Sequence, residues 1–229
     1  AASLLERNGD VLFDGYLRAD KPVQKRATTK MWAQAGLYRA RLGIESASAR
    51  VLESMQKETT PEGIAEVLRS LSSAGIRPTT YWIVGFPGES DQDFEATLAL
   101  VREIGFAQSF SFKYSPRPGT PAASARKQIP DGVKSERLER LQALLSAQTS
   151  AFAVGLVGQT FAVLFEKPGR YAGQLIGRSP HLQPVHVFAP AHAIGAFARV
   201  RVTEAKPRSV SAEVISERLP DARVAAVAL

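Results

Sequence analysis

The sequence predicts an α/β protein in which part of a parallel α/β barrel is followed by a small all-β barrel. Two patterns carry this prediction. The first half of the chain alternates strand segments with amphipathic helical segments, and the last third consists of short β segments broken by glycine and proline. The 229 residues are 45% hydrophobic, which is enough for one or two globular domains without disulfide or metal support.

The first clear unit is a strand followed by a helix. Residues 38–45 alternate between apolar and polar side chains, as a strand with one buried face does. Thr60 and Pro61 then form a helix start, and Gly75 forms its stop. The helix is amphipathic because apolar side chains recur at helical spacing, at Ile64, Val67, Leu68 and Leu71.

The same pattern repeats further along the chain. A strand is predicted at 79–86, a helix with a Ser90 and Asp93 capping box ends at Gly105, and another strand follows at 109–115. Alternating strands and helices indicate parallel βαβ units. We expect the apolar strand faces to pack against outer helices, and the polar faces to line a lumen with Arg39, Arg41, Glu45, Ser111 and Lys113.

The rest of the chain has a different sequence pattern, with one long helix followed by short strands. A polar helix at about 132–152 reads as a connector, with Leu138, Leu141, Leu145 and Phe152 on one stripe. Short strands are then predicted at 160–165, 174–177, 185–188, 197–204 and 211–215, as in a small closed barrel of the OB-like kind. The predicted domains are a partial α/β barrel at 1–130, a helical connector at 131–154, a β-barrel at 155–216 and a tail at 217–229.

Composition narrows the function. The chain has 29 Lys and Arg against 22 Asp and Glu, a net charge of +7, which favours a polyanionic partner. It has no cysteine, so this chain supplies no disulfide, no catalytic thiolate and no thiolate ligand for zinc or an iron-sulfur cluster. The three histidines have no metal-ligand spacing, and no run of residues is long and apolar enough for a membrane span. We therefore predict a cytoplasmic protein with no catalytic residue and no metal ligand of its own.

Two sets of motifs resemble a known family. Residues 83–89 (IVGFPGE) and 110–122 (FSFKYSPRPGTPA) resemble the second half of the radical S-adenosylmethionine (SAM) barrel of MiaB-type tRNA methylthiotransferases. Residues 165–170 (FEKPGR) and 177–180 (GRSP) resemble the TRAM domain of that family, a small RNA-binding barrel. This likeness covers about 76–216. The first 80 or so residues are more similar to cobalamin-binding radical-SAM enzymes, in 14–21 (DGYLRADK) and 41–46 (RLGIES).

The resemblance implies an activity and its cofactors. Intact relatives use SAM and 4Fe-4S clusters to insert a methylthio group at C2 of an isopentenyl-modified adenosine beside the anticodon. Their SAM-cleaving cluster is held by a Cys-x3-Cys-x2-Cys motif that is missing here. We therefore expect this chain alone to be catalytically inactive. The resemblance, together with the glycine-rich strand ends, predicts SAM contacts at Glu45, Ser46, Ser48, Gly85, Phe86, Pro87, Gly88, Glu89, Tyr114 and Arg117.

The β-rich tail is the predicted RNA-binding part. Its cations can neutralise phosphates and its aromatic and histidine rings can stack on bases. The expected partner is tRNA, with no membrane partner and no DNA. The predicted RNA-binding residues are Lys167, Arg170, Tyr171, Arg178, His181, His186, Arg199, Arg201, Lys206 and Arg208.

Three functional hypotheses remain open at this point. The first is that the chain supplies the SAM-side half barrel and the tRNA-binding domain of a methylthiotransferase. The second is a non-catalytic RNA-binding module whose half barrel is a scaffold. The third is part of a cobalamin-dependent radical-SAM methyltransferase, which only the first 80 residues favour.

Overall fold

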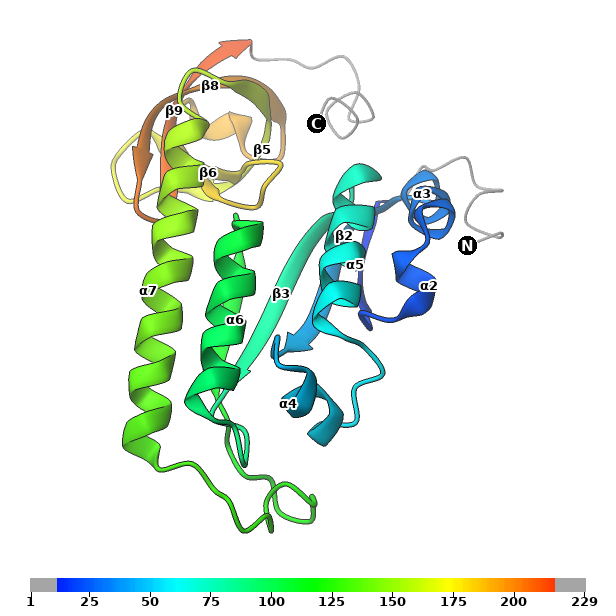
Figure 1. Ribbon diagram of the computed structural model, residues 1–229. Coiled ribbons are helices and arrows are strands. Elements are labelled where there is room, and N and C mark those ends of the chain that lie inside the picture. The colour runs from blue at the N-terminus through cyan, green and yellow to red at the C-terminus, as the bar shows by residue number, and fades with distance from the viewer. Residues whose placement is uncertain (1–11, 217–229) are drawn as a thin grey trace. The chain divides into compact units, whose positions relative to one another are not determined.

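Residues 12–216 are described in a computed structural model of the chain (Figure 1), which divides into two units between Leu145 and Ser146. The division falls within the long helix α7 (Asp131–Gly155), so its two ends contribute to different cores. The predicted tail at 217–229, and residues 1–11 of the predicted first domain, lie outside the described residues.

The first unit contains a four-stranded parallel sheet whose strands are in sequence order. Its strands are β1 (Phe13–Leu17), β2 (Leu37–Glu45), β3 (Arg77–Val84) and β4 (Ser109–Lys113). The predicted strands at 38–45, 79–86 and 109–115 correspond to β2, β3 and β4. The connecting helices are α2 (Lys21–Gln24), α3 (Arg26–Gln34), α4 (Ala49–Ser54), α5 (Pro61–Ser73) and α6 (Asp91–Ile104).

The predicted helix ends form as expected. The Thr60 hydroxyl accepts a hydrogen bond from the Gly63 amide at the start of α5. Ser90 and Asp93 make the capping box at the start of α6. Gly75 and Gly105, which follow these helices, have φ of 76° and 68°, left-handed values that glycine adopts without steric cost.

The helices cover one face of the sheet, and the apolar strand residues point towards them. Leu42, Ile44 and Trp82 are at most 1% exposed. The buried indole of Trp82 donates from Nε1 to the Ser109 hydroxyl at 2.8 Å and packs edge-on against Phe106. The opposite face, called the open face below, carries Arg41, as expected for the polar side of β2, and Tyr16 of the neighbouring β1.

The orientation predicted for β4 was wrong. Phe110 stacks on Tyr81, which stacks on Tyr16, so the aromatic side of β4 lies on the open face. Lys113 instead bonds to Asp131 and Ser135 of α7. Phe110 and Phe112 are 42% and 52% exposed. The inversion arises because α7 offers polar partners to Lys113, while the ring of Tyr81 offers a stacking partner to Phe110.

The second unit is a closed five-stranded barrel with strand order β5-β6-β7-β9-β8. Its core contains alternate strand residues such as Val163, Val185 and Val200, and the end of α7 adds Ala153. This confirms the predicted small β-barrel, and each of the five predicted strands is present. They are β5 (Thr160–Pro168), β6 (Gln174–Arg178), β7 (Pro184–Phe188), β8 (Phe197–Lys206) and β9 (Ser209–Ser216), with a short helix η1 (Ala191–Ala193) before β8.

Candidate SAM-binding rim and RNA-binding surface

The carboxyl ends of β2, β3 and β4 meet at one edge of the sheet, called the rim below. Arg50 of α4, the helix that follows β2, donates to the Gly88 carbonyl oxygen after β3 at 2.8 Å. The ring of Tyr114, just after β4, packs edge-on against Phe86 with 5.3 Å between centroids. The structure therefore brings together the predicted segments that follow the three strands. This is where α/β sheets bind ligands.

Glu45 ends β2 in a left-handed conformation, with φ of 69°. Its carboxylate folds back over Gly43, where a Cβ atom would lie 2.5 Å from Glu45 Oε1. Lys57 Nζ lies 3.2 Å from Glu45 Oε1 and donates to the Gly43 carbonyl oxygen at 3.2 Å. Glycine at position 43 thus makes room for an acidic side chain that is already paired.

The two predicted serines are engaged inside the protein. Ser46 is fully buried, and its hydroxyl accepts a hydrogen bond from the Ser48 amide at 3.1 Å. Ser48 caps α4 and donates to Asp93 Oδ1 at 2.6 Å, and Arg50 forms an ion pair with the same carboxylate. Burial alone would raise the pKa of Asp93, but the hydrogen bonds from Ser48, Ser90 and Arg50 outweigh it and hold that pKa well below its usual range. These hydroxyls therefore join the end of β2 to α6.

The turn after β3 is held in a similar way. Gly85 has φ of 75° and donates its amide to Glu89 Oε2 at 2.8 Å. Arg137 of α7 donates to the same oxygen at 2.7 Å and to Asp91 at 2.6 Å. The side chains of Glu89 and Arg137 are 1% and 6% exposed. Burial raises the pKa of Glu89, although the Gly85 amide and the Arg137 charge oppose this rise.

A second α7 residue packs against the same turn. A Cβ atom at Gly85 would lie 2.2 Å from Lys134 Cγ, so only glycine allows this approach. Lys134 Nζ also donates to the Tyr114 carbonyl oxygen at 3.4 Å. The start of α7 therefore fixes the backbone that follows both β3 and β4.

The rim keeps groups that fit a purine nucleoside. The Tyr114 hydroxyl is buried and has no hydrogen-bond partner in the described part of the chain. Phe86 provides an aromatic surface beside it. A Cβ atom at Gly88 would meet only Arg50, at 3.9 Å, so there is space beside this glycine, although its amide donates to the Lys127 carbonyl oxygen at 2.7 Å and its carbonyl oxygen accepts from Arg50. Arg117 lies in the exposed loop after β4. These groups fit SAM, whereas an iron-sulfur cluster does not fit the donor set of a chain without cysteine.

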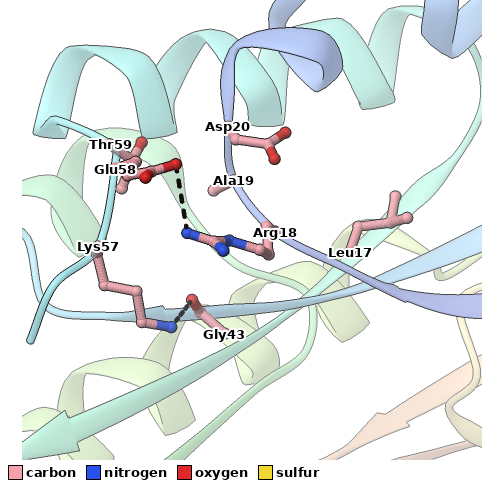
Figure 2. Close-up of a pocket in the computed structure, with 8 residues that line it drawn as sticks. All are labelled: Leu17, Arg18, Ala19, Asp20, Gly43, Lys57, Glu58 and Thr59. Atoms are coloured by element: carbon pink, nitrogen blue, oxygen red, sulfur yellow. Dashed lines mark hydrogen bonds and ion pairs between the residues drawn. The ribbon is translucent and has the colours of Figure 1, made fainter.

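A small polar pocket lies where β1 and β2 end (Figure 2). Its volume is about 80 Å³, enough for a few water molecules, and Arg18, Lys57 and Glu58 line it. Arg18 and Glu58 form an exposed ion pair at 3.8 Å, and Figure 2 shows Lys57 directed to the Gly43 carbonyl instead. Both cations are thus engaged by groups of the protein.

The predicted RNA-binding cations divide into two groups. Three of them pair with acidic side chains: Arg178 with Glu166 at 3.6 Å, Arg201 with Glu213 at 3.1 Å and Lys206 with Glu204 at 3.5 Å. Four have no acidic partner within residues 12–216, namely Lys167, Arg170, Arg199 and Arg208. All four are exposed, so they are the cations most accessible to a phosphate.

The predicted stacking residues also differ in their surroundings. Tyr171 is 61% exposed, with the Arg170 guanidinium 5.9 Å from its ring centroid. His181 packs edge-on against Phe152 at 4.9 Å. His186 is half-buried, and burial together with nearby Lys206 lowers its pKa. The sequence did not indicate Phe188 as a binding residue, because an aromatic residue at the end of a strand is expected in the core, whereas Phe188 is 69% exposed.

Comparison with known proteins agrees with both halves of this description. Residues 19–101 match the radical SAM superfamily model, and residues 155–215 match the TRAM domain model. The chain is 49% identical over 179 residues to a tRNA-2-methylthio-N(6)-dimethylallyladenosine synthase of Maricaulis maris (strain MCS10), covering 77% of this chain and 39% of that protein. This chain is a relative of the MiaB-type tRNA methylthiotransferases. The synthase of the same name from Agrobacterium fabrum (strain C58 / ATCC 33970) is 50% identical over 175 residues, covering 76% of this chain and 38% of its own length.

These comparisons also set the extent of the likeness. The aligned 179 residues exceed the range 76–216, so the methylthiotransferase likeness reaches into the part of the chain that resembled cobalamin enzymes. The chain spans less than two fifths of the length of either synthase. Coproporphyrinogen III oxidase from Escherichia coli, a radical SAM enzyme, has a similar fold, with a TM-score of 0.56 at 15% identity over 87% of this chain and 50% of its own.

Several residues that build the rim escaped the sequence reasoning. Arg137 was assigned to a connector helix, and Arg50 was not noticed. Asp93 was recognised only as part of a capping box, although it also binds Ser48 and Arg50. Each of these contacts joins residues more than 40 positions apart in the sequence, so no local sequence pattern predicts them. No helix within residues 12–216 is long and apolar enough to cross a membrane.

Proposed function

We propose that this chain supplies the SAM-side half barrel and the tRNA-binding domain of a methylthiotransferase that acts on isopentenyl-modified adenosine beside the anticodon. The observation that carries this proposal is that one chain matches the radical SAM model and then the TRAM model, and is about half identical to two synthases over three quarters of its length. We further propose a cytoplasmic location, because a tRNA substrate would be met there.

The rim is the part that would hold SAM. The Tyr114 hydroxyl is available to hydrogen-bond an adenine or ribose, Phe86 can lie along the purine face, and Gly88, which has no side chain, leaves space for the ligand beside it. Bound there, SAM supplies the methyl group and the radical precursor of the family's chemistry. Ser46, Ser48 and Glu89 act indirectly, because their polar atoms position the backbone of the rim.

The barrel is the part that would hold tRNA. Lys167, Arg170, Arg199 and Arg208 neutralise phosphates, since an unpaired surface cation gains most from replacing counterions on a polyanion. Paired cations such as Arg201 first have to leave their carboxylate. DNA binding is not expected, because the chemistry inferred for the family acts on an RNA nucleoside.

The experiment combines two measurements on the full chain. Filter binding should show retention of tRNA, and an assay after attempted cluster reconstitution should show no 5′-deoxyadenosine above a no-protein control, because the chain has no thiolate. Absence of tRNA binding would sink the RNA part of the proposal. Formation of 5′-deoxyadenosine by the chain alone would show that our account of the missing cluster ligands is wrong.

A second candidate is a non-catalytic RNA-binding module. The hydrogen bonds of Ser46, Ser48 and Glu89 favour it, since the polar atoms of these residues, which were expected to contact a cofactor, bond to other groups of the protein instead. Equilibrium dialysis with SAM separates the two candidates. Binding that weakens in Tyr114→Phe supports the methylthiotransferase role, and no SAM binding at all supports the module.

A further inference from the structure

Two aromatic side chains stand exposed at one end of the TRAM barrel. Tyr171 lies in the loop between β5 and β6 and is 61% exposed, and Phe188 ends β7 and is 69% exposed. A phenylalanine with most of its ring in water gains nothing from burial in this fold. Neither ring therefore belongs to the barrel core.

The backbone holds these two positions close together. Gln174, at the start of β6, is the cross-strand partner of Phe188 in the β6–β7 ladder. The Gln174 amide donates to the Tyr171 carbonyl oxygen at 3.0 Å, and the Ala189 amide donates to the Gly173 carbonyl oxygen at 3.0 Å. The loop that carries Tyr171 is thus hydrogen-bonded to Gln174, the cross-strand partner of Phe188, and to Ala189, the residue after Phe188.

The loop itself is pinned rather than open. Gln174 Oε1 accepts the Arg170 amide at 3.0 Å, and the Gly169 amide donates to the Gln174 carbonyl oxygen at 2.6 Å. Arg170 lies with its guanidinium 5.9 Å from the Tyr171 ring centroid. A pre-organised aromatic residue loses little conformational freedom when a planar ligand stacks on it.

Charge around the pair indicates the ligand. Arg170 and Lys167 lie on this loop and on the adjoining strand, and neither has an acidic partner within residues 12–216. His186, two residues before Phe188 and therefore on the same strand face, is kept neutral near neutral pH by its lowered pKa. Exposed rings flanked by unpaired cations suit a ligand with flat bases and a phosphate backbone.

We propose that Tyr171 and Phe188 form a stacking site for unpaired RNA bases, with Arg170 and Lys167 holding the adjoining phosphates. The proposal rests on the proposed function and adds to it that the barrel recognises single-stranded nucleotides. In a duplex the faces of the bases are stacked on one another and cannot be reached by a side chain.

The test measures binding of the full chain to single-stranded oligouridylate and to an RNA duplex of the same length. Phe188→Ala and Tyr171→Ala should each weaken single-strand binding by about 5- to 150-fold, the range expected for one lost base stack. The salt dependence should stay unchanged because no phosphate contact is removed. Duplex binding should change little, and Tyr171→Phe should behave as the unaltered chain because it keeps the ring.

Controls separate stacking from damage to the barrel. Val157→Ala removes apolar surface that is 47% exposed in the same unit and should leave binding unchanged. Phe188→Trp should retain affinity, and the fluorescence of the new indole should be quenched by oligouridylate if a base stacks on it. A barrel that remains folded, with Phe188→Ala binding as tightly as the unaltered chain, overturns the proposal.

The outcomes also distinguish this inference from the proposed function. Salt-dependent tRNA binding that persists unchanged in both alanine variants would leave the proposed function standing and overturn the stacking site. Loss of all RNA binding in the unaltered chain would overturn both. Self-association that disappears in Phe188→Ala without any effect on RNA would assign the patch to a second copy of the chain, and would also overturn the proposal.

Discussion

Replacing Arg137 by methionine tests whether α7 holds the glycine-rich turn of the rim. The side chains of Arg137 and Glu89 are 6% and 1% exposed, and the guanidinium bonds to the Glu89 carboxylate, the Glu89 carbonyl and Asp91. Methionine keeps much of the volume but leaves the Glu89 carboxylate buried without a counter-charge. Removing one partner of such a pair costs about 3–5 kcal/mol in the free energy of unfolding.

Denaturant unfolding followed by tryptophan fluorescence measures this loss. Both tryptophans, Trp32 and Trp82, lie in the first unit, so the signal reports that unit. Arg140→Met is the matched control. Arg140 also lies over the Phe94 ring, but its ion pair with Glu95 is about half exposed, so the expected loss is less than about 1 kcal/mol.

A double variant sharpens the interpretation. Glu89→Gln removes the unpaired charge and keeps an oxygen for the Gly85 amide. The double variant Arg137→Met with Glu89→Gln should therefore lose less stability than the two single losses added together, by about 1–3 kcal/mol. If Arg137→Met costs no more than Arg140→Met, or if the two single losses simply add, the buried pair does not hold the turn and the reasoning fails.

Further predictions follow from the same contacts. Folding lowers the pKa of Asp93, so this carboxylate adds stability above its unfolded pKa, and that stability is lost as the pH falls towards the folded pKa. Asp93→Asn should therefore make the free energy of unfolding less dependent on pH below about pH 4. Urea unfolding that shows the same pH dependence in the variant and the unaltered chain would refute this. The lowered pKa of His186 leaves it neutral near neutral pH, so His186→Gln should not alter the salt dependence of RNA binding there, whereas a flatter dependence would show that the histidine is charged. In hydrogen exchange, amides of β4 should exchange faster than those of the closed barrel, because within residues 12–216 β4 has a paired neighbour on one side only; equal protection would indicate that the sheet edge is covered.

Much of the fold follows from local patterns. The alternation in β2 placed Leu42 and Ile44 in the core, and the Thr60 and Ser90 caps set the starts of α5 and α6. The β4 orientation could not be obtained in this way. Its aromatic and polar residues alternate equally well on either face, and only the stacking of Phe110 on Tyr81 and the bonds of Lys113 to α7 decide between them.

The site was less predictable than the fold for a similar reason. The motif pattern located Gly85, Gly88 and Tyr114 at the rim, but it assigned ligand roles to Ser46, Ser48 and Glu89, whose polar atoms bond within the protein. In the barrel, net charge could not distinguish Lys167 from Arg201, because pairing with Glu213 depends on the β8–β9 register. Long-range pairing therefore decides which polar residues stay available.

The salt dependence of tRNA binding tests the central claim most directly. Four cations without acidic partners, if all four contact phosphates, predict a slope of about −3 to −4 for the logarithm of the binding constant against the logarithm of salt concentration. Lys167→Ala should flatten this slope by about 0.7 to 1, and Arg201→Ala, which removes a cation paired with Glu213, should leave it nearly unchanged. Binding that does not depend on salt, or equal slopes in the unaltered chain and Lys167→Ala, would contradict the account.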